Sequence, residues 1–289
     1  MDAALHRKRR RPQLRARLLW PVLPRWPRHD QQIGWLTLPP APDASNVRAI
    51  LLDIEGTTTP IDFVFKTLFP YAAEHVEEFL RRRCSEPEVK TLIADLRATW
   101  SGAASSGAPV WLESTPDEKL ASAAAYVRWL IGRDSKITPL KTLQGKIWEE
   151  GFRAGALEGE VYPDVRPALA RWREQGRRIA IFSSGSVLAQ KLLFAHSTAG
   201  DLSSYLEAYF DTSTGPKRDP DSYKKIAAAL GLPTEQVLFV SDVPAELDAA
   251  ADARLHTAHA LRPGVEKLES LAHPAIHTFA EVLQEGKGH

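Results

Sequence analysis

The sequence predicts an α/β protein with a doubly wound parallel sheet that is interrupted by an all-helical insert. Short apolar runs such as Ala49 to Leu52 and Arg178 to Phe182 end in turn residues and alternate with helical patterns. Runs of this length are typical of strands buried on both faces of a parallel sheet. Residues 63–155, in contrast, carry only helical periodicity. These observations predict a sheet with right-handed crossovers and one helical insertion.

Composition sets the limits on what the chain can be. The 289 residues are 44% hydrophobic, enough for one large or two modest domains, and the net charge is +1. A charge this small argues against a nucleic-acid or membrane partner for the folded domains. No apolar run approaches the roughly 20 residues that span a bilayer. Cys84 is the single cysteine, which is consistent with a reducing compartment, so we expect a cytoplasmic protein.

Residues 1–46 differ from the rest of the chain. They hold nine Lys or Arg against three acids, together with seven prolines, and show no periodicity. We expect a basic, disordered extension. Two alternatives stay open: an arm around Arg7 to Arg11 that binds nucleic acid or an anionic surface, or a transit peptide.

The start of the chain carries a further hypothesis. Met1 is the only methionine, and Val47 directly precedes the first strand. Valine is a residue that an alternative start codon encodes, so we expect the natural product to begin at or near Val47. The intact mass of the natively expressed protein tests this, and a mass that includes residues 1–46 would contradict it.

The first strand, Ala49 to Leu52, ends in two carboxylates, Asp53 and Glu55, which Gly56 follows. In open α/β sheets, ligands bind beyond the carboxyl ends of the strands. We therefore expect Asp53 to face a site while Gly56 lets the backbone turn away.

The insert reads as four helices. Apolar residues recur at three- and four-residue spacings, the second helix begins at Pro87, and the Gly/Ala/Ser run from Ser101 to Pro109 predicts a flexible link. The first expected helix has its inner face between Phe65 and Leu80 and its outer face up to Arg83, and the second has its inner face between Val89 and Leu96. The other two span about Pro116 to Arg133 and Thr138 to Ala154.

The alternating pattern resumes at Val161. Asp164 is expected to cap the first helix of this part, which Gly176 ends. The expected helices are Val165 to Gln175, Val187 to His196, Asp221 to Leu230 and Ala245 to Ala253, and the expected strands are Arg178 to Phe182, Tyr209 to Asp211, Gln236 to Val240 and Leu255 to Ala260. We thus predict three parts: the extension 1–46, an α/β core of 47–62 and 156–289, and the helical insert 63–155.

Polar residues follow the predicted strands at four places. They are Asp53 with Glu55, Ser183 with Ser184, Lys217, and Asp242 with Glu246. Each has a structural explanation alone: the serines could cap a helix, the lysine could be solvated, and Glu246 could favour a helix dipole. Because parallel strands bring their carboxyl ends to one edge, we expect these residues to form one site.

These residue types together suit a phosphate ester and a divalent cation. Carboxylates are the ligands that Mg²⁺ accepts, and hydroxyls with N–H groups at a helix start bind phosphate oxygens. A lysine neutralises charge in the phosphoryl-transfer transition state. An aspartate held this way can attack phosphorus, and Glu55 is placed to act as acid and then base.

The order DxE-GT, SS-G-S, lysine and SD, with a helical insert after the first motif, resembles the haloacid dehalogenase (HAD) superfamily of capped phosphatases. Most of its phosphatases have Asp where Glu55 stands. The strings DIEGTTTPIDFV, TLFPYA, TPLKTLQGKIW, FSSGSVLAQKLLFAHSTAGD, YFDTSTGPK and SDVPAELDAA resemble the enolase-phosphatase family of methionine salvage. This resemblance runs from about Val47 to His277.

The resemblance implies a Rossmann-like core with the insert as a cap, one Mg²⁺ per chain and a monomer. It implies that Asp53 is nucleophile and metal ligand, and that Glu55 takes part in metal binding and acid/base work. The other implied roles are substrate binding by Ser183, Ser184 and Lys217, with Lys217 also catalytic, and metal binding by Asp242 and Glu246. Thr57 would hydrogen-bond near the nucleophile and substrate, or be an ordinary turn threonine.

The family's activity is bifunctional, which implies an acireductone synthase. It enolises 2,3-diketo-5-methylthiopentyl 1-phosphate and then removes the phosphate, leaving the acireductone. No residue identifies the enolisation base, and the aromatic residues Phe63, Phe65 and Trp148 are expected either in the core or beside the methylthio end. Two alternatives remain: a capped phosphatase for another small phosphomonoester, and a binding or regulatory protein without turnover.

Overall fold

The computed structural model describes residues 46–103, 107–263 and 272–283. All the described residues belong to one compact unit, Leu38–His289. The predictions for the N-terminal extension therefore lie, except for Asn46, outside the described residues.

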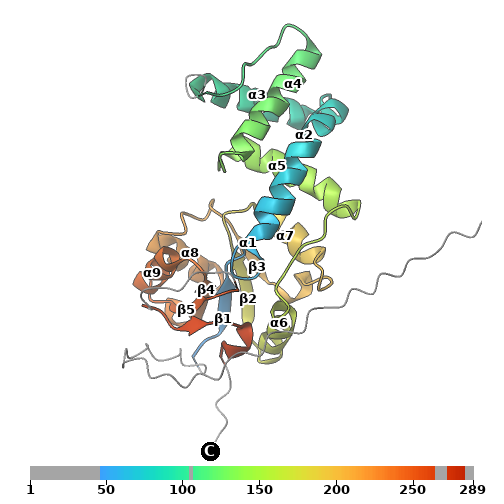
Figure 1. Ribbon diagram of the computed structural model, residues 1–289. Coiled ribbons are helices and arrows are strands. Elements are labelled where there is room, and N and C mark those ends of the chain that lie inside the picture. The colour runs from blue at the N-terminus through green and yellow to red at the C-terminus, as the bar shows by residue number, and fades with distance from the viewer. Residues whose placement is uncertain (1–45, 104–106, 264–271, 284–289) are drawn as a thin grey trace, which may run out of the picture. The chain divides into compact units, whose positions relative to one another are not determined.

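Six parallel strands form one sheet in the order β3-β2-β1-β4-β5-β6 (Figure 1). The central strand β1 pairs with β2 on one side and β4 on the other, so that Leu52 lies beside Ile181 and Val240. The predicted strands are confirmed within two residues, whereas the short β6 was missed because two residues carry no pattern. The strands are β1 (Ala49–Leu52), β2 (Arg178–Phe182), β3 (Ala208–Phe210), β4 (Val237–Ser241), β5 (His256–Ala260) and β6 (Ala275–Ile276).

Helices cover both faces of the sheet, as the predicted doubly wound fold requires. Ile50 and Leu52 of β1 pack into the hydrophobic cluster that contains Trp172, while Ala49 and Leu51 pack into a second cluster with Tyr223. Alternate residues of one strand thus face opposite helical layers, which is why the strand is apolar throughout. The layers are α6 (Val165–Glu174) and α7 (Val187–Ala195) on one face, and α8 (Pro220–Ala229) and α9 (Pro244–Asp252) on the other.

The insert is helical, but its first helix is not regular. After the α-helical residues Ile61–Phe63, it continues as a π-helical segment, η1, and π-helical turns are frequent at functional sites. The expected link from Ser101 to Pro109 is wrong at its start, because helix α3 continues to Ala103, while residues 104–106 lie outside the description. The elements are α1 (Ile61–Phe63), η1 (Val64–Leu68), α2 (Phe69–Arg83), α3 (Pro87–Ala103), α4 (Pro116–Ile131) and α5 (Thr138–Arg153).

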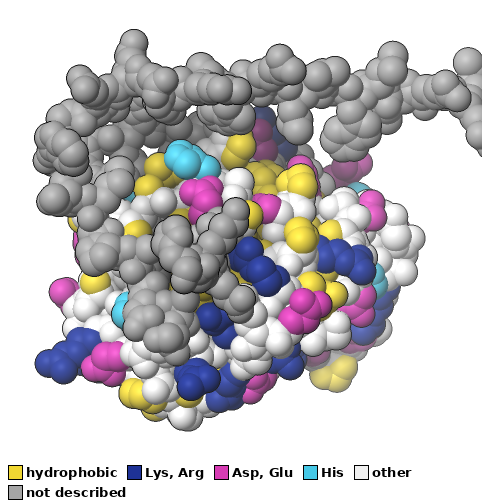
Figure 2. All heavy atoms as spheres, turned by 90° about the horizontal axis from the view of Figure 1, so that it is seen from below, with side chains coloured by type: hydrophobic (Ala, Val, Ile, Leu, Met, Phe, Trp, Pro, Cys, Tyr) yellow, Lys and Arg dark blue, Asp and Glu magenta, His cyan; other side chains and the backbone are white. Residues whose placement is uncertain are grey.

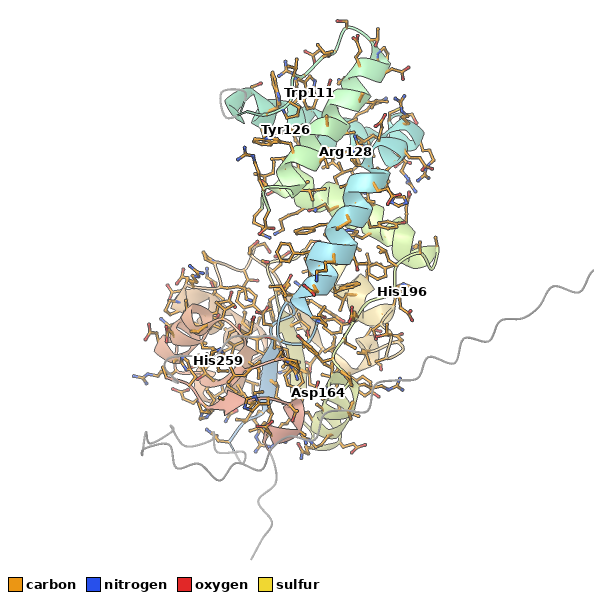
Figure 3. The ribbon with its side chains drawn as sticks, in the orientation of Figure 1. Trp111, Tyr126, Arg128, Asp164, His196 and His259 are labelled. Carbon is orange, nitrogen blue, oxygen red and sulfur yellow. The ribbon has the colours of Figure 1, made fainter. Side chains whose placement is uncertain are left out.

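Long-range contacts hold the helical part together. Arg128 of α4 donates from Nε to the carbonyl of Ala73 in α2 at 2.9 Å and pairs with Glu77. Trp111 and Tyr126 stack edge to face, 6.1 Å apart (Figure 3). The Arg128 contacts fix α4 against α2, and the ring contact packs the segment before α4 onto that helix.

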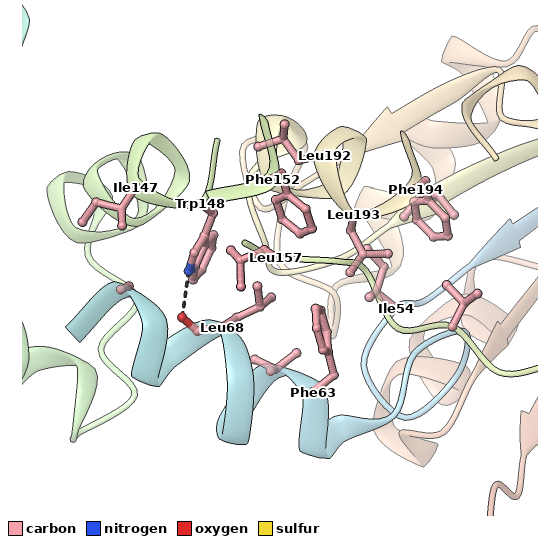
Figure 4. Packing of buried hydrophobic residues seen from close by; sticks show 14 of the residues in the cluster. Ile54, Phe63, Leu68, Ile147, Trp148, Phe152, Leu157, Leu192, Leu193 and Phe194 are labelled. Carbon is pink, nitrogen blue, oxygen red and sulfur yellow. Dashed lines mark hydrogen bonds between the residues drawn. The ribbon is translucent and has the colours of Figure 1, made fainter. Parts of the chain in front are cut away.

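One hydrophobic cluster runs from the sheet into the helical part. Leu68 and Phe63 meet Phe152 and Leu193 there, and the indole of Trp148 donates to the carbonyl of Leu68 at 2.8 Å (Figure 4). Core and insert therefore belong to one compact unit, and the predicted domain boundaries at residues 63 and 155 stay a prediction.

Asp164 does not cap α6 as predicted. Its backbone is already helical and its side chain makes no capping bond. Instead, Oδ2 accepts hydrogen bonds from Arg262 Nη1 at 2.7 Å and from the backbone N–H of Phe279 at 2.6 Å. The carboxylate, at the start of α6 (Figure 3), thus anchors the last described segment to that helix.

The surface carries both signs of charge. Figure 2 shows Lys, Arg, Asp and Glu side chains interspersed on the face opposite the helical part, where no uncertain residues cover it. Among the described helices, none is both long enough and apolar enough to cross a membrane.

Candidate active site

A cavity of about 280 Å³ lies between the carboxyl ends of β1, β2 and β4 and the helices of the insert. Seven of the eight predicted site residues line it, so the sheet brings them together as expected: Asp53, Glu55, Ser183, Ser184, Lys217, Asp242 and Glu246. The eighth, Thr57, is fully buried beneath the cavity. Its Oγ1 accepts a hydrogen bond from the backbone N–H of Asp242 at 3.0 Å.

Asp53 is fixed at the floor of this cavity. The residue is only 2% exposed, and its Oδ1 lies 2.6 Å from Lys217 Nζ. The same oxygen accepts from the backbone N–H of Ile54, and Oδ2 accepts from Ser241 Oγ at 3.1 Å. Hydrogen bonds to its charged form hold the carboxylate in one orientation.

Lys217 bridges two acids. Its Nζ lies 2.6 Å from Asp53 and 2.6 Å from Glu246 Oε2. Burial lowers the pKa of Lys217, but the charges of Asp53 and Glu246 outweigh it and raise the pKa above its usual value. The lysine is therefore cationic at every physiological pH and supplies a fixed positive charge to the cavity floor.

Glu55 is partly buried and accepts a hydrogen bond from Ser183 Oγ at 3.2 Å. Burial, and secondly the charge of Asp53, raise the pKa of Glu55 above its ordinary value. A carboxyl group with a raised pKa exchanges protons more readily near neutral pH. Its position two residues beyond Asp53 suits a proton donor and acceptor.

Asp242 has the arrangement expected of a cation ligand. Burial, helped by the charge of Asp53, raises the pKa of Asp242 to about 7. Its buried Oδ1 has no hydrogen-bond partner among the described residues. Gly56, at φ +73°, passes so close that a Cβ there would lie 2.1 Å from Asp242 Oδ2. A buried carboxylate without a partner is costly, and a divalent cation removes that cost.

The carboxylates around the cavity suit a cation that needs few protein ligands. Within the described ranges, no three His, Cys, Asp or Glu side chains are arranged to hold a metal ion. Mg²⁺ is usually bound by one or two carboxylates, with waters and substrate phosphate completing its shell. Glu246, by contrast, is occupied by Lys217 and by Ser241 Oγ at 3.2 Å.

The loop after β2 supplies hydroxyl groups and N–H groups. Ser183 Oγ accepts from the backbone N–H of Gly185 at 3.0 Å, and Ser184 lines the cavity. The cap of α7 is Ser186, whose Oγ accepts from the N–H of Ala189. Neither Ser183 nor Ser184 caps this helix, which leaves both beside a helix N-terminus suited to phosphate.

Two supporting residues were missed by sequence reasoning. Ser241 links Asp53 to Glu246 through one hydroxyl, and its place directly before Asp242 at a strand end was an available signal. Arg262 is the second, and it is 5% exposed and donates from Nε to the carbonyl of Thr57 at 2.8 Å. No local pattern marks that contact, since 205 residues separate the partners.

The helical side of the cavity is mostly apolar. Phe65 is 49% exposed and lines the cavity, as does Trp148, which stacks on Phe69. Phe63 is buried and does not line it. Phe65 and Trp148 therefore face the cavity, with Trp148 also part of the hydrophobic cluster, whereas Phe63 belongs to the core alone.

Comparisons with known proteins agree with this geometry. A family model described as haloacid dehalogenase-like hydrolase matches residues 47–254. Enolase-phosphatase E1 of Synechococcus elongatus is 51% identical over 237 residues, which are 82% of this chain and 98% of that protein. Enolase-phosphatase E1 of Pseudomonas aeruginosa is 46% identical over 83% of this chain and 99% of its own length.

A solved structure is also similar. The UTR4 protein of Saccharomyces cerevisiae superposes with a TM-score of 0.67 at 32% identity, covering 82% of this chain and 100% of that one. Both the expected fold and the expected enzyme class, a hydrolase, are thereby confirmed. The chain belongs to the haloacid dehalogenase-like hydrolases and, within them, to the enolase-phosphatase family.

Proposed function

We propose that this protein is a Mg²⁺-dependent acireductone synthase of methionine salvage. It enolises 2,3-diketo-5-methylthiopentyl 1-phosphate and then releases phosphate. One observation carries the proposal: Asp53 is held between Lys217 and Ser241 at the floor of a cavity whose opposite wall is apolar. Such a cavity suits a small ester with a phosphate at one end and an apolar chain at the other.

The phosphatase step proceeds through Asp53. A carboxylate oxygen of Asp53 attacks phosphorus, and the bond between phosphorus and the C1 oxygen breaks. Glu55 gives its proton to that oxygen. Glu55 then takes a proton from water, whose oxygen attacks the aspartyl-phosphate. Phosphate leaves and Asp53 regains its carboxylate.

Ser183, Ser184 and Lys217 bind the phosphoryl oxygens in this proposal. The serines lie at the start of α7, and Lys217 places its charge beside the attacking oxygen. Preorganised donors of this kind stabilise the charge of the transition state without moving.

Asp53 and Asp242 would hold one Mg²⁺. When bound, this ion neutralises charge on the transferring phosphoryl group. The metal-binding roles of Glu55 and Glu246 stay predictions, and the bonds of Glu246 to Lys217 favour a role in orienting the lysine. The monomeric state and the cytoplasmic location also stay predictions.

The test is an assay of phosphate release from the diketo phosphate, with Mg²⁺ and with EDTA. We expect Mg²⁺-dependent turnover, and we expect Asp53→Asn to lower kcat by at least about 10⁴-fold, since it removes the nucleophile. Full activity of Asp53→Asn would refute the mechanism. A substrate panel in which a sugar phosphate is preferred over the diketo compound would refute the substrate.

A further inference from the structure

The helical wall of the cavity holds one deeply buried polar side chain. Gln144, in the middle of α5, lines the cavity and is only 4% exposed. Its amide has no hydrogen-bond partner among the residues that the structure describes. Buried amides are nearly always hydrogen-bonded because their desolvation is costly. No polar atom of Gln144 is among the fully buried unpartnered ones, so the amide of this otherwise buried residue opens to the cavity, where a ligand would supply its hydrogen bonds.

The position of α5 shows which part of a ligand Gln144 would meet. A Cβ on the next residue, Gly145, would lie 3.6 Å from Ser186 Oγ, so this turn of α5 packs against the loop that follows β2. Trp148, one turn further along, belongs to the apolar wall of the same cavity. Gln144 thus lies between the phosphate end and the apolar end.

The lysines of the insert that line the cavity already have a hydrogen-bond or ion-pair partner. Lys141, one turn before Gln144, donates from Nζ to Thr212 Oγ1 at 3.1 Å. Lys136 pairs with Asp134 at 2.5 Å. Of the polar residues of the insert that line the cavity, Gln144 is the one that is both buried and without a hydrogen-bond partner among the described residues.

We infer that Gln144 binds the dicarbonyl group of the substrate and stabilises the enediolate, an inference that rests on the function proposed above. The two carbonyl groups of that substrate lie between its phosphate ester and its methylthio end. Enolisation breaks a C1–H bond, forms a C1–C2 double bond and moves an electron pair to the C2 oxygen, while the proton passes to a carboxylate of the cavity. The amide N–H of Gln144 donates to the oxygen that gains charge, and so binds the transition state more strongly than the ground state.

The experiment separates enolisation from phosphate transfer. A phosphonate analogue of the diketo phosphate, with CH₂ in place of the ester oxygen, cannot lose phosphate. Exchange of its C1 hydrogens with D₂O, followed by NMR, reports enolisation by the intact enzyme. Release of p-nitrophenol from p-nitrophenyl phosphate reports the phosphatase groups, since that ester has no carbonyl.

We expect Gln144→Leu, which keeps the side chain's size, to slow C1 exchange by about 100-fold, as loss of one oxyanion donor does. Its kcat/KM for p-nitrophenyl phosphate should stay within about twofold of wild type. Gln144→Glu should slow exchange further, because it sets a negative charge against the enediolate. Thr142→Val, on the same helix but outside the cavity lining, is the matched control and should change neither rate.

The outcomes are distinct. If the wild-type protein neither releases phosphate from the diketo phosphate nor exchanges the analogue, the proposed function fails. If the wild type does both and Gln144→Leu exchanges at the same rate, the inference about Gln144 is wrong. A loss of both activities in Gln144→Leu would also overturn it, because the side chain would then support the site as a whole.

Discussion

The two sides of the cavity are built in opposite ways. On the sheet side, Lys217 and Ser241 are both bonded to Asp53, and all three residues lie at the end of a strand or in the turn after one. On the helical side, the wall is mostly apolar, and the amide of Gln144 has no hydrogen-bond partner among the described residues. The sheet side is thus preorganised for phosphoryl transfer, which the hydrolysis of every phosphate ester needs. The helical side has the shape and polarity that select one ester. Mutations on the two sides should therefore affect different kinetic constants.

The largest effect is expected on the sheet side, at Lys217→Met. The change leaves two buried carboxylates, Asp53 and Glu246, without their cation, so we expect kcat to fall about 100- to 1,000-fold. The free energy of unfolding, measured by urea denaturation, should fall by about 3–5 kcal/mol. Lys224→Met is the matched control, since its exposed pair with Asp221 should contribute at most about 1 kcal/mol. A kcat of Lys217→Met equal to that of the wild type would contradict the claim that the floor of the cavity is preorganised.

Arg262→Met tests the support beneath the floor. Arg262 lies between the rings of Tyr162 and Phe279, 4.5 and 4.3 Å from their centroids, and bonds Thr57 and Asp164. Loss of these bonds leaves Asp164 without its cation, so we expect a loss of about 2–4 kcal/mol in unfolding free energy. We expect kcat to fall by less than about tenfold, with KM little changed, since Arg262 does not line the cavity. Arg153→Met, at an exposed pair with Glu149, is the control, and an equal loss of stability there would contradict the assignment.

The effect of pH on metal binding is expected to be smaller. The pKa of Asp242 is raised to about 7 in the folded protein without metal. Between the ordinary pKa of an aspartate and pH 7, the folded protein therefore keeps a proton on Asp242 that the unfolded chain has already released. The stability of the metal-free protein should therefore fall as pH rises toward 7. Mg²⁺ needs the ionised carboxylate, so the increase in Tm on adding Mg²⁺ to EDTA-treated protein should be larger at about pH 8 than at about pH 6. An increase independent of pH would show that Asp242 does not bind the ion.

Phe65→Ala probes the helical side and should have the smallest effect. Because Phe65 is 49% exposed, its loss should barely change stability. We expect KM for the diketo phosphate to rise about three- to tenfold, through lost apolar contact, while inhibition by inorganic phosphate stays unchanged. Leu112→Ala, which removes an equally exposed side chain outside the cavity lining, serves as control. A matching rise in the inhibition constant for phosphate would show that the two sides are not separable.

Much of the sheet side was predictable because its residues follow local patterns. Short apolar runs identified five of six strands, and parallel strands must bring their carboxyl ends to one edge. Asp53, Ser183 and Asp242 could therefore be placed in one site before any contact was known. The strand β6 was not predicted, because two residues in a parallel edge pair carry no periodicity.

The sequence by itself determined the fold class, the family and which residues meet at the sheet edge. Only the tertiary structure decided that Lys217 joins Asp53 to Glu246, that Asp164 bonds Arg262 instead of capping a helix, and that Gln144 faces a cavity without a partner. The physical reason is the range of the interactions. Strands and helix ends are set by neighbouring residues, whereas these contacts join side chains from different elements whose approach depends on how the whole chain packs.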